Sequence, residues 1–413
     1  MFYNVYMDRN IYTTAIVGGG AAGLFLATQL QGKTVLFERG ERLGRKLSAT
    51  GNGQGNLSNQ HLSPDRYFSV EKTDSPALKN ALSCFGVKEL YAYMRSLGTL
   101  LFADERGRVY PTSRQASSLT DALRFYLAEK ADIRLSSLVK SVQKTKDGFL
   151  IEYENEGTTR RMLAEYLLFA TGGKAAKNFG TDGSAYSLLR SLGHTLTPLY
   201  PSLVQLKTDV THTKALKGIR VPSARVTATV NGKTQSVTGD IIFTDYGVSG
   251  DAAFRLSAFL AGDKLDLATL SIDFLPDFTK DALTEFLAEK LSNGGTRKGE
   301  LLCGVLNNQI ARAIERRYEN ASVKTLVEAI KSFTLSIKGS LGFDYAQVTK
   351  GGVKTDEIDE NFQSKFAENA YLLGELLDID GECGGYNLHF AYASASVAAT
   401  DVLQKIQKTR GQV

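Results

Sequence analysis

The sequence predicts an α/β fold in which the first domain is interrupted by an inserted small β-domain and a helical subdomain. Three observations lead to this prediction. A strand, a glycine-rich turn, a helix and a second strand follow one another in residues 12–38, which is the pattern of a Rossmann-like domain. A further strand and a glycine-led helix near the carboxyl terminus complete that domain, and the residues between read first as alternating strands and then as helices. The expected boundaries are 1–195 and 345–413 for the Rossmann-like domain, 196–275 and 332–344 for the β-rich domain, and 276–331 for the helical subdomain.

Composition is that of an ordinary folded protein, with 43% hydrophobic and 23% charged residues, and 413 residues are more than one hydrophobic core usually supports. The net charge of +5 could attract an anionic cofactor or an RNA but establishes neither. Three cysteines, odd in number and far apart, argue against a disulfide framework. The four histidines show no metal-ligand spacing, so no metal site is predicted.

The amino-terminal segment has no basic region followed by an apolar region and a small-residue cleavage site, so no secretion signal is expected. No segment approaches the roughly 18 consecutive apolar residues that cross a bilayer. We therefore expect a cytoplasmic protein without a membrane partner.

The turn at 18–23 has glycines where a dinucleotide-binding turn needs them. Gly18 permits the tight turn, Gly20 lets the backbone approach a pyrophosphate, and Gly23 allows the helix to pack on the strand. The helix that begins near Ala21 and Ala22 would present free N–H groups and a positive dipole end to the phosphates.

Glu38 ends the second strand, twenty residues after Gly18. A carboxylate there can accept hydrogen bonds from an adenosine ribose and would repel a 2′-phosphate, which favours FAD or NAD. Basic residues follow that could pair with phosphate oxygens, unless this is only a solvated loop. They are Arg39, Arg45 and Lys46, and the glycine-rich loop after them, whose backbone could lie against a ligand, includes Gly51, Asn52 and Gly53.

Two later segments suit FAD rather than NAD. A buried strand at 166–173 ends in Thr171, Gly172 and Gly173, and a strand at 370–373 leads into an acidic turn. In that turn Asp378 could hold ribityl hydroxyls, and the next helix, which runs to about residue 403, would stabilise negative charge at the flavin N1–C2=O edge. A merely glycine-rich helix start is the alternative. The predicted contacts of this segment are Gly374, Glu375, Asp378, Gly384, Gly385, Tyr386 and Asn387.

These motifs resemble those of the three-domain FAD-binding flavoproteins described as aminoacetone-oxidase-like or NAD(FAD)-utilising dehydrogenases. That family also includes a bile-acid-pathway reductase and a ribosomal-RNA dihydrouridine synthase. The resemblance covers nearly the whole chain, and its motifs are GGGAAGL at 18–24, GRKL at 44–47, the loop at 51–59, ATGG at 170–173, TDGSAY at 181–186, FTDYGVSG at 243–250 and GELLDIDGECGGYNLHFAYAS from residue 374. Gln54 and Gly55 replace the family's usual Arg-Cys pair, so chemistry or RNA contacts drawn from that pair are not carried over.

The leading prediction is an FAD-dependent oxidoreductase in which flavin N5 exchanges a hydride with a small organic substrate, by reducing a conjugated double bond or oxidising an amine. No second GxGxxG turn follows a strand, so NADH or NADPH would bind only transiently. The acid–base candidates are Glu375, Tyr246 and Cys383. Two alternatives stay open: a flavoenzyme that reduces uridine in ribosomal RNA, although no RNA-binding motif stands out, and a flavin-binding protein with a structural role.

Overall fold

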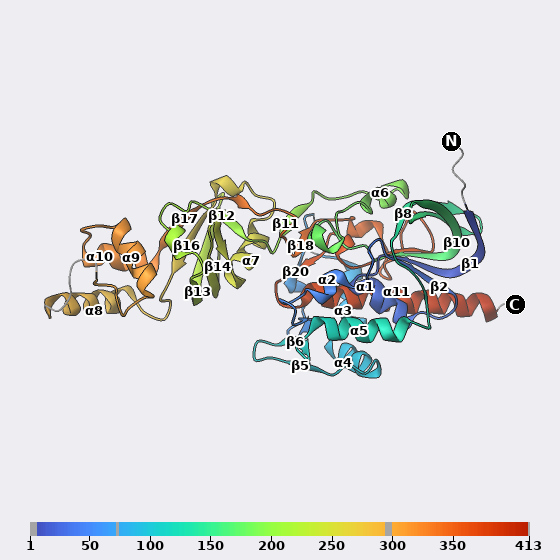
Figure 1. Ribbon diagram of the computed structural model, residues 1–413, viewed down its shortest axis with the longest axis horizontal. Helices are drawn as coiled ribbons and strands as arrows, with labels where there is room; N and C mark the ends of the chain where they lie inside the picture. The colour runs from blue at the N-terminus through green and yellow to red at the C-terminus, as the bar shows by residue number, and fades with distance from the viewer. Residues whose placement is uncertain (1–5, 72–73, 294–299, 412–413) are drawn as a thin grey trace. The chain divides into compact units, whose positions relative to one another are not determined.

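The computed structural model describes residues 6–71, 74–293 and 300–411, and it divides the chain into two compact units (Figure 1). Unit 1 consists of Met1–Leu199 and Val348–Val413, and unit 2 consists of Tyr200–Gln347. Unit 2 is therefore inserted between two parts of unit 1. A further division of unit 2 into a β-rich and a helical domain stays a prediction.

The central sheet of unit 1 contains seven strands within the described ranges. Their order is β7-β2-β1-β10-β9-β8, and β19 pairs with the carboxyl end of β10. Pairing is parallel among β7, β2, β1, β10 and β19, and antiparallel among β8, β9 and the first part of β10. The predicted α/β class with a Rossmann-like sheet is thus confirmed. The strands are β1 (Tyr6–Val17), β2 (Thr34–Phe37), β7 (Asp132–Arg134), β8 (Ser137–Thr145), β9 (Gly148–Asn155), β10 (Thr158–Phe169) and β19 (Ala370–Leu372).

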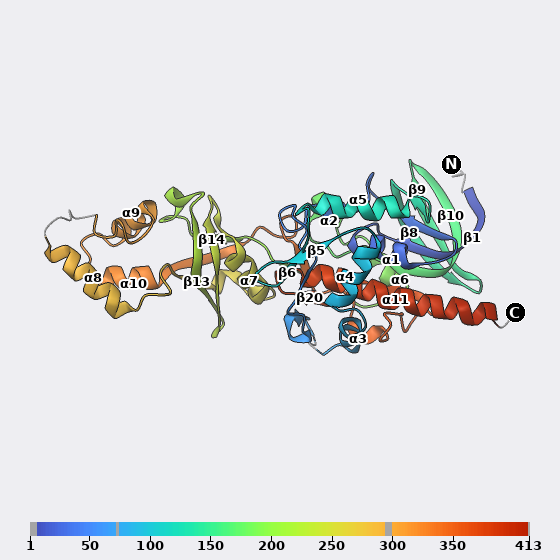
Figure 2. The ribbon, with the colours of Figure 1, turned by 90° about the horizontal axis from the view of Figure 1, so that it is seen from below.

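The parallel strands are apolar because helices cover the sheet. All four residues of β2 are buried, and α1 (Ala21–Gln29) packs against both β1 and the long helix α11 (Tyr386–Gly411). The two helices lie side by side in both views (Figure 1 and Figure 2), with α5 (Ala116–Leu127) against α1. α1 starts directly after the turn, and α11 runs beyond residue 403 to Gly411.

Shorter elements complete unit 1, including the small sheets β3-β6-β5 and β20-β4. They are α2 (Arg45–Ser48), β3 (Ser58–Asn59), η1 (Pro64–Arg66), β4 (Tyr67–Phe68), α3 (Pro76–Cys84), α4 (Val87–Ser96), β5 (Leu101–Ala103), β6 (Arg108–Pro111), η2 (Lys177–Phe179), α6 (Tyr186–Ser191), β18 (Val348–Lys350), η5 (Thr355–Glu357), η6 (Gly374–Leu376) and β20 (Asp380–Gly381).

Unit 2 contains a closed barrel with the strand order β12-β15-β14-β13-β16-β17, and α7 packs on β13 and β14. One hydrophobic cluster joins barrel residues such as Leu270 with Leu287, Ile314 and Ile330 of the helices. Its elements are β11 (Tyr200–Ser202), β12 (Leu206–Thr208), η3 (Lys214–Leu216), β13 (Arg220–Val230), β14 (Lys233–Phe243), β15 (Gly247–Ser249), α7 (Asp251–Leu260), η4 (Leu265–Leu267), β16 (Thr269–Asp273), α8 (Lys280–Ser292), α9 (Asn308–Arg317), α10 (Val323–Lys331) and β17 (Phe333–Ser340).

Among the helices of the described residues, none is long and apolar enough to span a bilayer. Residues 1–5, on which the expectation about a secretion signal partly rests, lie outside the described ranges. The cellular compartment stays a prediction.

Candidate functional site

Close backbone contacts explain two of the three glycines in the first turn. Gly18 has φ +108°, and a Cβ there would lie 2.5 Å from the carbonyl oxygen of Ala170 at the end of β10. A Cβ on Gly23 would lie 1.8 Å from the Gly18 oxygen. Gly20 differs, because a Cβ there would come no closer than 4.0 Å to its nearest neighbour, again the oxygen of Ala170. Gly18 and Gly23 therefore serve chain packing, while Gly20 leaves space beside its backbone.

Helix α1 starts at this turn with its amino terminus open to a ligand. Its N-cap residue, Gly20, provides no side-chain hydrogen bond, and the first turn contains no acidic residue. The N–H groups of Ala21, Ala22 and Gly23 precede the first intrahelical hydrogen bond, which Leu24 donates to Gly20 at 2.9 Å. Free N–H groups and the positive dipole end suit a pyrophosphate.

Glu38 joins the glycine turn to the loop after β2. One carboxylate oxygen accepts a hydrogen bond from Gly19 N–H at 3.0 Å, and the other accepts one from Gly40 N–H at 2.7 Å. A carboxylate offers about four acceptor positions, so lone pairs remain for ribose hydroxyls. The geometry is compatible with the adenosine end of FAD.

The three predicted basic residues hold one loop to residues 175–182. Arg39 forms an ion pair with Asp182 at 2.8 Å, and Arg45 donates to the carbonyl oxygen of Asn178 at 2.8 Å. Burial alone would raise the pKa of Asp182, but hydrogen bonds, led by those from Arg39 and Ser184, lower it to about 2. Arg39 and Arg45 thus already have protein partners.

Lys46 belongs to a compact polar cluster with Glu375 and Thr349. Lys46 Nζ lies 2.6 Å from one Glu375 oxygen, and Thr349 N–H donates to the other at 3.0 Å. Thr349 Oγ1 in turn accepts two backbone N–H groups just after Gly173, at 2.7 and 2.9 Å. A Cβ on Gly173 would lie 2.4 Å from Thr349 Oγ1. The structure therefore brings together three predicted residues, Lys46, Gly173 and Glu375. Thr349 joins them, and the sequence pattern did not reveal it.

The neighbouring glycines also adopt left-handed backbone conformations. Gly172 has φ +69°, and a Cβ there would meet the Thr181 side chain at 3.1 Å. Gly374 has φ +64°, and its N–H donates to Ser394 Oγ of α11 at 3.1 Å. Thr171, at the end of β10, is half-buried. These backbones line the carboxyl ends of β10 and β19, where open α/β sheets bind ligands.

The loop at 51–53 stands apart from this cluster in its contacts. Gly51, Asn52 and Gly53 have positive φ and are exposed. The Gly53 carbonyl oxygen accepts a hydrogen bond from Ala116 N–H at 2.8 Å. These contacts hold the loop at the start of α5, and a role against the cofactor stays a proposal.

Asp378 and Asp380 are both buried in the turn before α11, with only 2% and 1% of their surfaces exposed. Asp378 accepts hydrogen bonds from Val70 N–H at 2.9 Å and from Glu71 N–H at 3.4 Å, and burial raises its pKa. The Oδ1 atom of Asp380 has no hydrogen-bond partner among the described residues. Burial raises the pKa of Asp380 to about 7.

Tyr186, at the start of α6, is another of the buried polar side chains that lack a hydrogen-bond partner among the described residues. It is 3% exposed, and its hydroxyl makes no hydrogen bond to any described residue. Burial raises its pKa, and the nearby carboxylates of Glu375 and Asp378 add to that effect. Neither Tyr186 nor Asp380 was singled out from sequence, although both stand inside matching motifs, TDGSAY and GELLDIDG.

Tight contacts also fix the start of α11. Gly385 has φ +101°, and a Cβ there would lie 2.3 Å from Ser58 O. The Asn387 side chain both accepts from Gly381 N–H and donates to Gly381 O, each at 2.8 Å. The Tyr386 carbonyl oxygen accepts a hydrogen bond from a tyrosine hydroxyl of β4 at 3.0 Å. The side chain of Asn387 therefore shapes the turn.

Gly384 lies just before α11, and the acid–base candidates Cys383 and Tyr246 lie in different units. Gly384 has φ +126°, and its carbonyl oxygen accepts from Asn59 Nδ2 at 3.0 Å. Cys383, a half-buried cysteine outside any disulfide, is its neighbour in unit 1. Tyr246 belongs to unit 2, where it is half-buried between β14 and β15 and its carbonyl oxygen accepts from Thr208 N–H at 3.0 Å.

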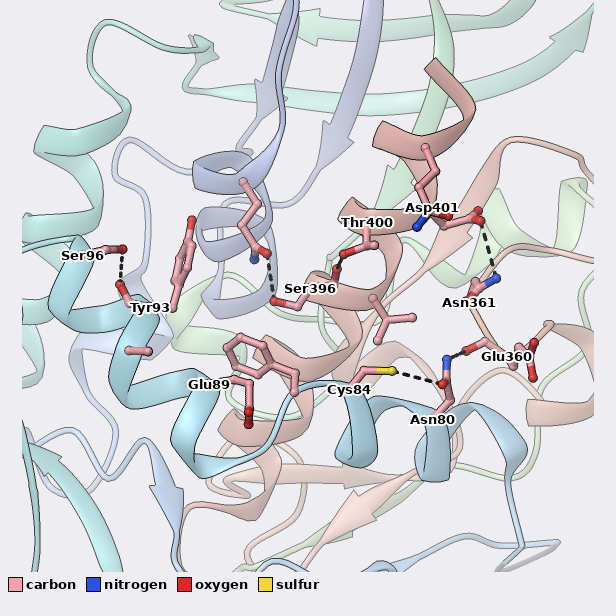
Figure 3. Close-up of a pocket in the computed structure, with 15 residues that line it drawn as sticks. Asn80, Cys84, Glu89, Tyr93, Ser96, Glu360, Asn361, Ser396, Thr400 and Asp401 are labelled. Carbon is pink, nitrogen blue, oxygen red and sulfur yellow. Dashed lines mark hydrogen bonds between the residues drawn. The ribbon is translucent and has the colours of Figure 1, made fainter. Parts of the chain in front are cut away.

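A groove of about 680 Å³ lies elsewhere in unit 1, between α1, α3, α4 and α11 (Figure 3). Its lining includes Cys84, Tyr93, Ser396 and Asp401 but none of the predicted cofactor residues. Ser396 is ten residues beyond the first residue of α11, or about 15 Å along the axis. The groove is therefore separate from the helix start.

Comparisons with known proteins agree with this fold. Residues 12–401 match the family described as HI0933-like protein Rossmann domain. A 3-dehydro-bile acid delta(4,6)-reductase of Clostridium scindens is 34% identical over 406 residues, covering 93% of this chain and 97% of that protein. A ribosomal RNA dihydrouridine synthase of Escherichia coli is 27% identical over 424 residues, covering 96% and 99%.

Among solved structures, a 3-ketosteroid-delta4-(5alpha)-dehydrogenase of Rhodococcus jostii RHA1 has a TM-score of 0.51 at 14% identity, with 97% of each chain covered. At that identity the likeness concerns the fold alone. The predicted family and the predicted enzyme class, an FAD-dependent oxidoreductase, are confirmed by the matches together. The chain belongs to the HI0933-like Rossmann-domain family.

Proposed function

We propose that the protein reduces a carbon–carbon double bond conjugated with a carbonyl group in a small organic substrate, with hydride from flavin N5. The names of two relatives support this reaction. A delta(4,6)-reductase of a 3-dehydro-bile acid and a dihydrouridine synthase both act on a double bond conjugated with a carbonyl group. The first is the more similar, at 34% against 27% identity, which favours a small ketone. Amine oxidation has no comparable support.

The observation that carries the cofactor assignment is the uncapped start of α1 beside Glu38. In this proposal the N–H groups of residues 21–23 bind the pyrophosphate, and Glu38 binds the adenosine ribose. Lys46 adds positive charge near the carboxyl ends of the strands. Gly20 leaves room for the phosphates. The nearest atom lies 4.0 Å from the place of a Cβ, so a side chain at this position would itself fill the space that the phosphates need.

When bound, FAD supplies hydride exchange at N5. The amino terminus of α11, a 26-residue helix, favours negative charge at the pyrimidine edge of the flavin. Glu375 acts in binding rather than in proton transfer, because Lys46 and Thr349 already hold both of its oxygens. Tyr246 and Cys383 remain candidates for proton transfer.

We infer that NADH or NADPH reduces the flavin during a transient encounter. The test is to purify the protein with its flavin, mix it anaerobically with each nicotinamide, and follow the loss of flavin absorption. A conjugated enone is then added. Bleaching by a nicotinamide followed by recovery with the enone is expected. A flavin that no nicotinamide reduces, or whose reduced form no enone reoxidises, would contradict the proposal.

The second candidate is reduction of uridine in ribosomal RNA, which the dihydrouridine synthase relatives favour. The net charge of +5 would assist RNA binding. Binding of a ribosomal RNA fragment that weakens steeply with added salt would support this candidate. No binding at low salt would remove it.

A further inference from the structure

Arg114 is an exposed arginine whose guanidinium group lies against two aromatic rings. It follows β6, and its Cζ atom lies 4.7 Å from the ring centre of Phe102 and 5.6 Å from that of Tyr110. The two rings stack on each other with their centres 5.9 Å apart. A guanidinium group stacks through its face, so its N–H groups, which lie in the plane, remain available to other partners.

The backbone at Arg114 is also fixed. Its φ is +50°, in the left-handed region that a residue with a Cβ seldom adopts. Its N–H donates to Pro111 O at 2.9 Å, which closes the turn after β6. Residues held in such a conformation gather at sites that bind ligands, where the surrounding structure supports the strain. The turn and the two rings therefore present the guanidinium group in one orientation.

The positive charge of Arg114 is not neutralised within the described part of the chain. Arg108, on the same hairpin, forms an ion pair with Asp104 at 2.7 Å. Among the described residues Arg114 has no such carboxylate, and its Nη1 donates only a long hydrogen bond of 3.4 Å to Gln54 Oε1. An oriented guanidinium group without a counter-ion is suited to bind an anion.

The turn that contains Arg114 packs on the glycine-rich loop that follows α2. Ala116 N–H donates to Gly53 O at 2.8 Å, and a Cβ on Gly55 would lie 3.0 Å from Ala116 Cα. Gln54, the hydrogen-bond partner of Arg114, belongs to the same loop, and both side chains are exposed. A molecule in solvent can therefore reach them.

The far end of that loop joins the start of α11, beside which the proposed function puts the pyrimidine edge of the flavin. In the amide orientation that satisfies both of its groups, Asn56 accepts a hydrogen bond from Gly385 N–H at 3.2 Å. The pKa of Tyr110 is raised mainly by burial, and Cys383 is among the nearby groups that add to the effect. β3 contacts both β6 and α11, and β6 lies by the start of α11 in both views (Figure 1 and Figure 2). The rings that support Arg114 thus belong to the surroundings of this helix start.

The charge of the hairpin favours a single oxyanion over a polyanion such as RNA. Residues 100–115 contain three arginines and two acidic residues, a net charge of only +1. A surface that binds RNA gathers several unpaired cations along one face. A carboxylate offers two oxygens in one plane, which a guanidinium group binds side by side.

We propose that Arg114 binds a carboxylate group of the substrate and so selects anionic substrates for reduction at the flavin. This inference rests on the proposed function, and it names the class of conjugated carbonyl compound, one that carries a carboxylate away from its double bond. Gln54 supplies a second polar contact from the glycine-rich loop. Arg114 takes no part in hydride transfer, so it acts on substrate binding rather than on the rate of the bound complex.

The test uses two forms of one enone, benzalacetone with a para-carboxylate on its ring and benzalacetone itself. Each is titrated into the oxidised holoenzyme, whose flavin has no hydride to give, so calorimetry measures binding without reaction. Wild type should bind the carboxylate form about tenfold or more tightly, because only this form makes charge-assisted hydrogen bonds to the arginine. In Arg114→Asn the preference should disappear, while binding of the neutral enone stays the same.

Asparagine is chosen because it tolerates a left-handed backbone, and Arg114→Gly serves if this variant does not fold. Arg114→Lys keeps the charge without the planar group and should retain part of the preference. The matched control, Arg106→Asn, removes an exposed charge from the same hairpin and should retain all of it. Equal losses in Arg106→Asn and Arg114→Asn, no preference in wild type, or a full preference in Arg114→Asn would each overturn the proposal.

Kinetics separate this inference from the proposed function. If neither enone reoxidises the reduced wild-type flavin, the proposed function fails, while calorimetry still tests Arg114. If the enones react, Arg114→Asn should raise KM for the carboxylate form about tenfold and leave kcat and the KM for NADH unchanged. A raised KM for NADH alone would assign the anion to the nicotinamide phosphates and overturn the assignment to the substrate.

Discussion

His389 makes the stability of unit 1 depend on pH. It lies on α11 with 0% of its surface exposed, and burial lowers its pKa to about 4. The Phe85 carbonyl oxygen can only accept, so His389 Nε2 donates to it at 2.9 Å. Nδ1 then accepts from Ser58 Oγ at 2.8 Å. Both nitrogens are used by the neutral ring, so a second proton would break one of these bonds.

The magnitude follows from linkage between protonation and unfolding. The unfolded histidine titrates near pH 6.5 and the folded one near 4, so the unfolded state binds more protons between these values. Stability is therefore complete above about pH 6.5 and is lost as the pH falls toward 4. Lowering the pH from 7 to 5 should cost about 2 kcal/mol through His389, out of about 3 kcal/mol at pH 4 and below.

The assay is urea unfolding at pH 7 and pH 5 of wild type and His389→Gln, with the same saturating FAD, because bound cofactor also stabilises the fold. The amide of glutamine can still donate to Phe85 but does not titrate. The loss of stability between pH 7 and 5 should shrink by about 2 kcal/mol in this variant. His194, whose pKa burial also lowers, keeps its share in both proteins. The exposed His212→Gln is the control, and a His389→Gln variant with the full wild-type loss would refute the reasoning.

Three further substitutions test the site. Gly23→Ala should prevent folding of unit 1, because a Cβ would lie 1.8 Å from Gly18 O. Gly20→Ala should fold with an unchanged melting temperature but bind FAD at least about tenfold more weakly, which fluorescence titration measures. Lys46→Met should cost roughly 1–2 kcal/mol in urea unfolding, and the double variant with Glu375→Gln should be less than additive; strict additivity would contradict the pairing. Tyr186→Phe should lower the free energy of unfolding of the FAD-free protein by less than about 0.5 kcal/mol, because its hydroxyl has no hydrogen-bond partner among the described residues. Removal of a hydrogen-bonded hydroxyl costs about 1 kcal/mol, so a loss of that size or more would show that the Tyr186 hydroxyl has a partner.

The local parts of the fold could be predicted from the sequence. The strand at Thr34–Phe37 agrees residue for residue, because a short, continuous apolar run bounded by glycine and polar residues has few other solutions. The strand that ends at Phe169 was predicted at 166–173, so the prediction covers only its last four residues, which are all buried, and runs past its end. Its first half alternates between buried and partly exposed residues and forms a hairpin with β9, so local apolarity alone did not reveal it.

The barrel could not be predicted from local pattern. Its closure pairs Leu206–Thr208 with Phe333–Ser340, more than 120 residues later in the chain. The long strand β14 continues through a glycine, because Gly239 packs on α7 without interrupting the ladder. Such pairings depend on partners that no window of neighbouring residues contains.

The same limit explains why sequence reasoning chose Asp378 and missed Asp380. Two aspartates in LLDIDG have equivalent local sequence, and a ribityl-binding acid could be either one. What separates them is Val70 and Glu71, some 308 residues away in the chain, whose N–H groups satisfy Asp378 and leave Asp380 without an equivalent. A buried acid whose bonds are complete holds backbone in place, whereas burial without such bonds raises the pKa of Asp380 to about 7. Hydrogen bonds from distant parts of the chain therefore decide which of the two acids is satisfied within the protein.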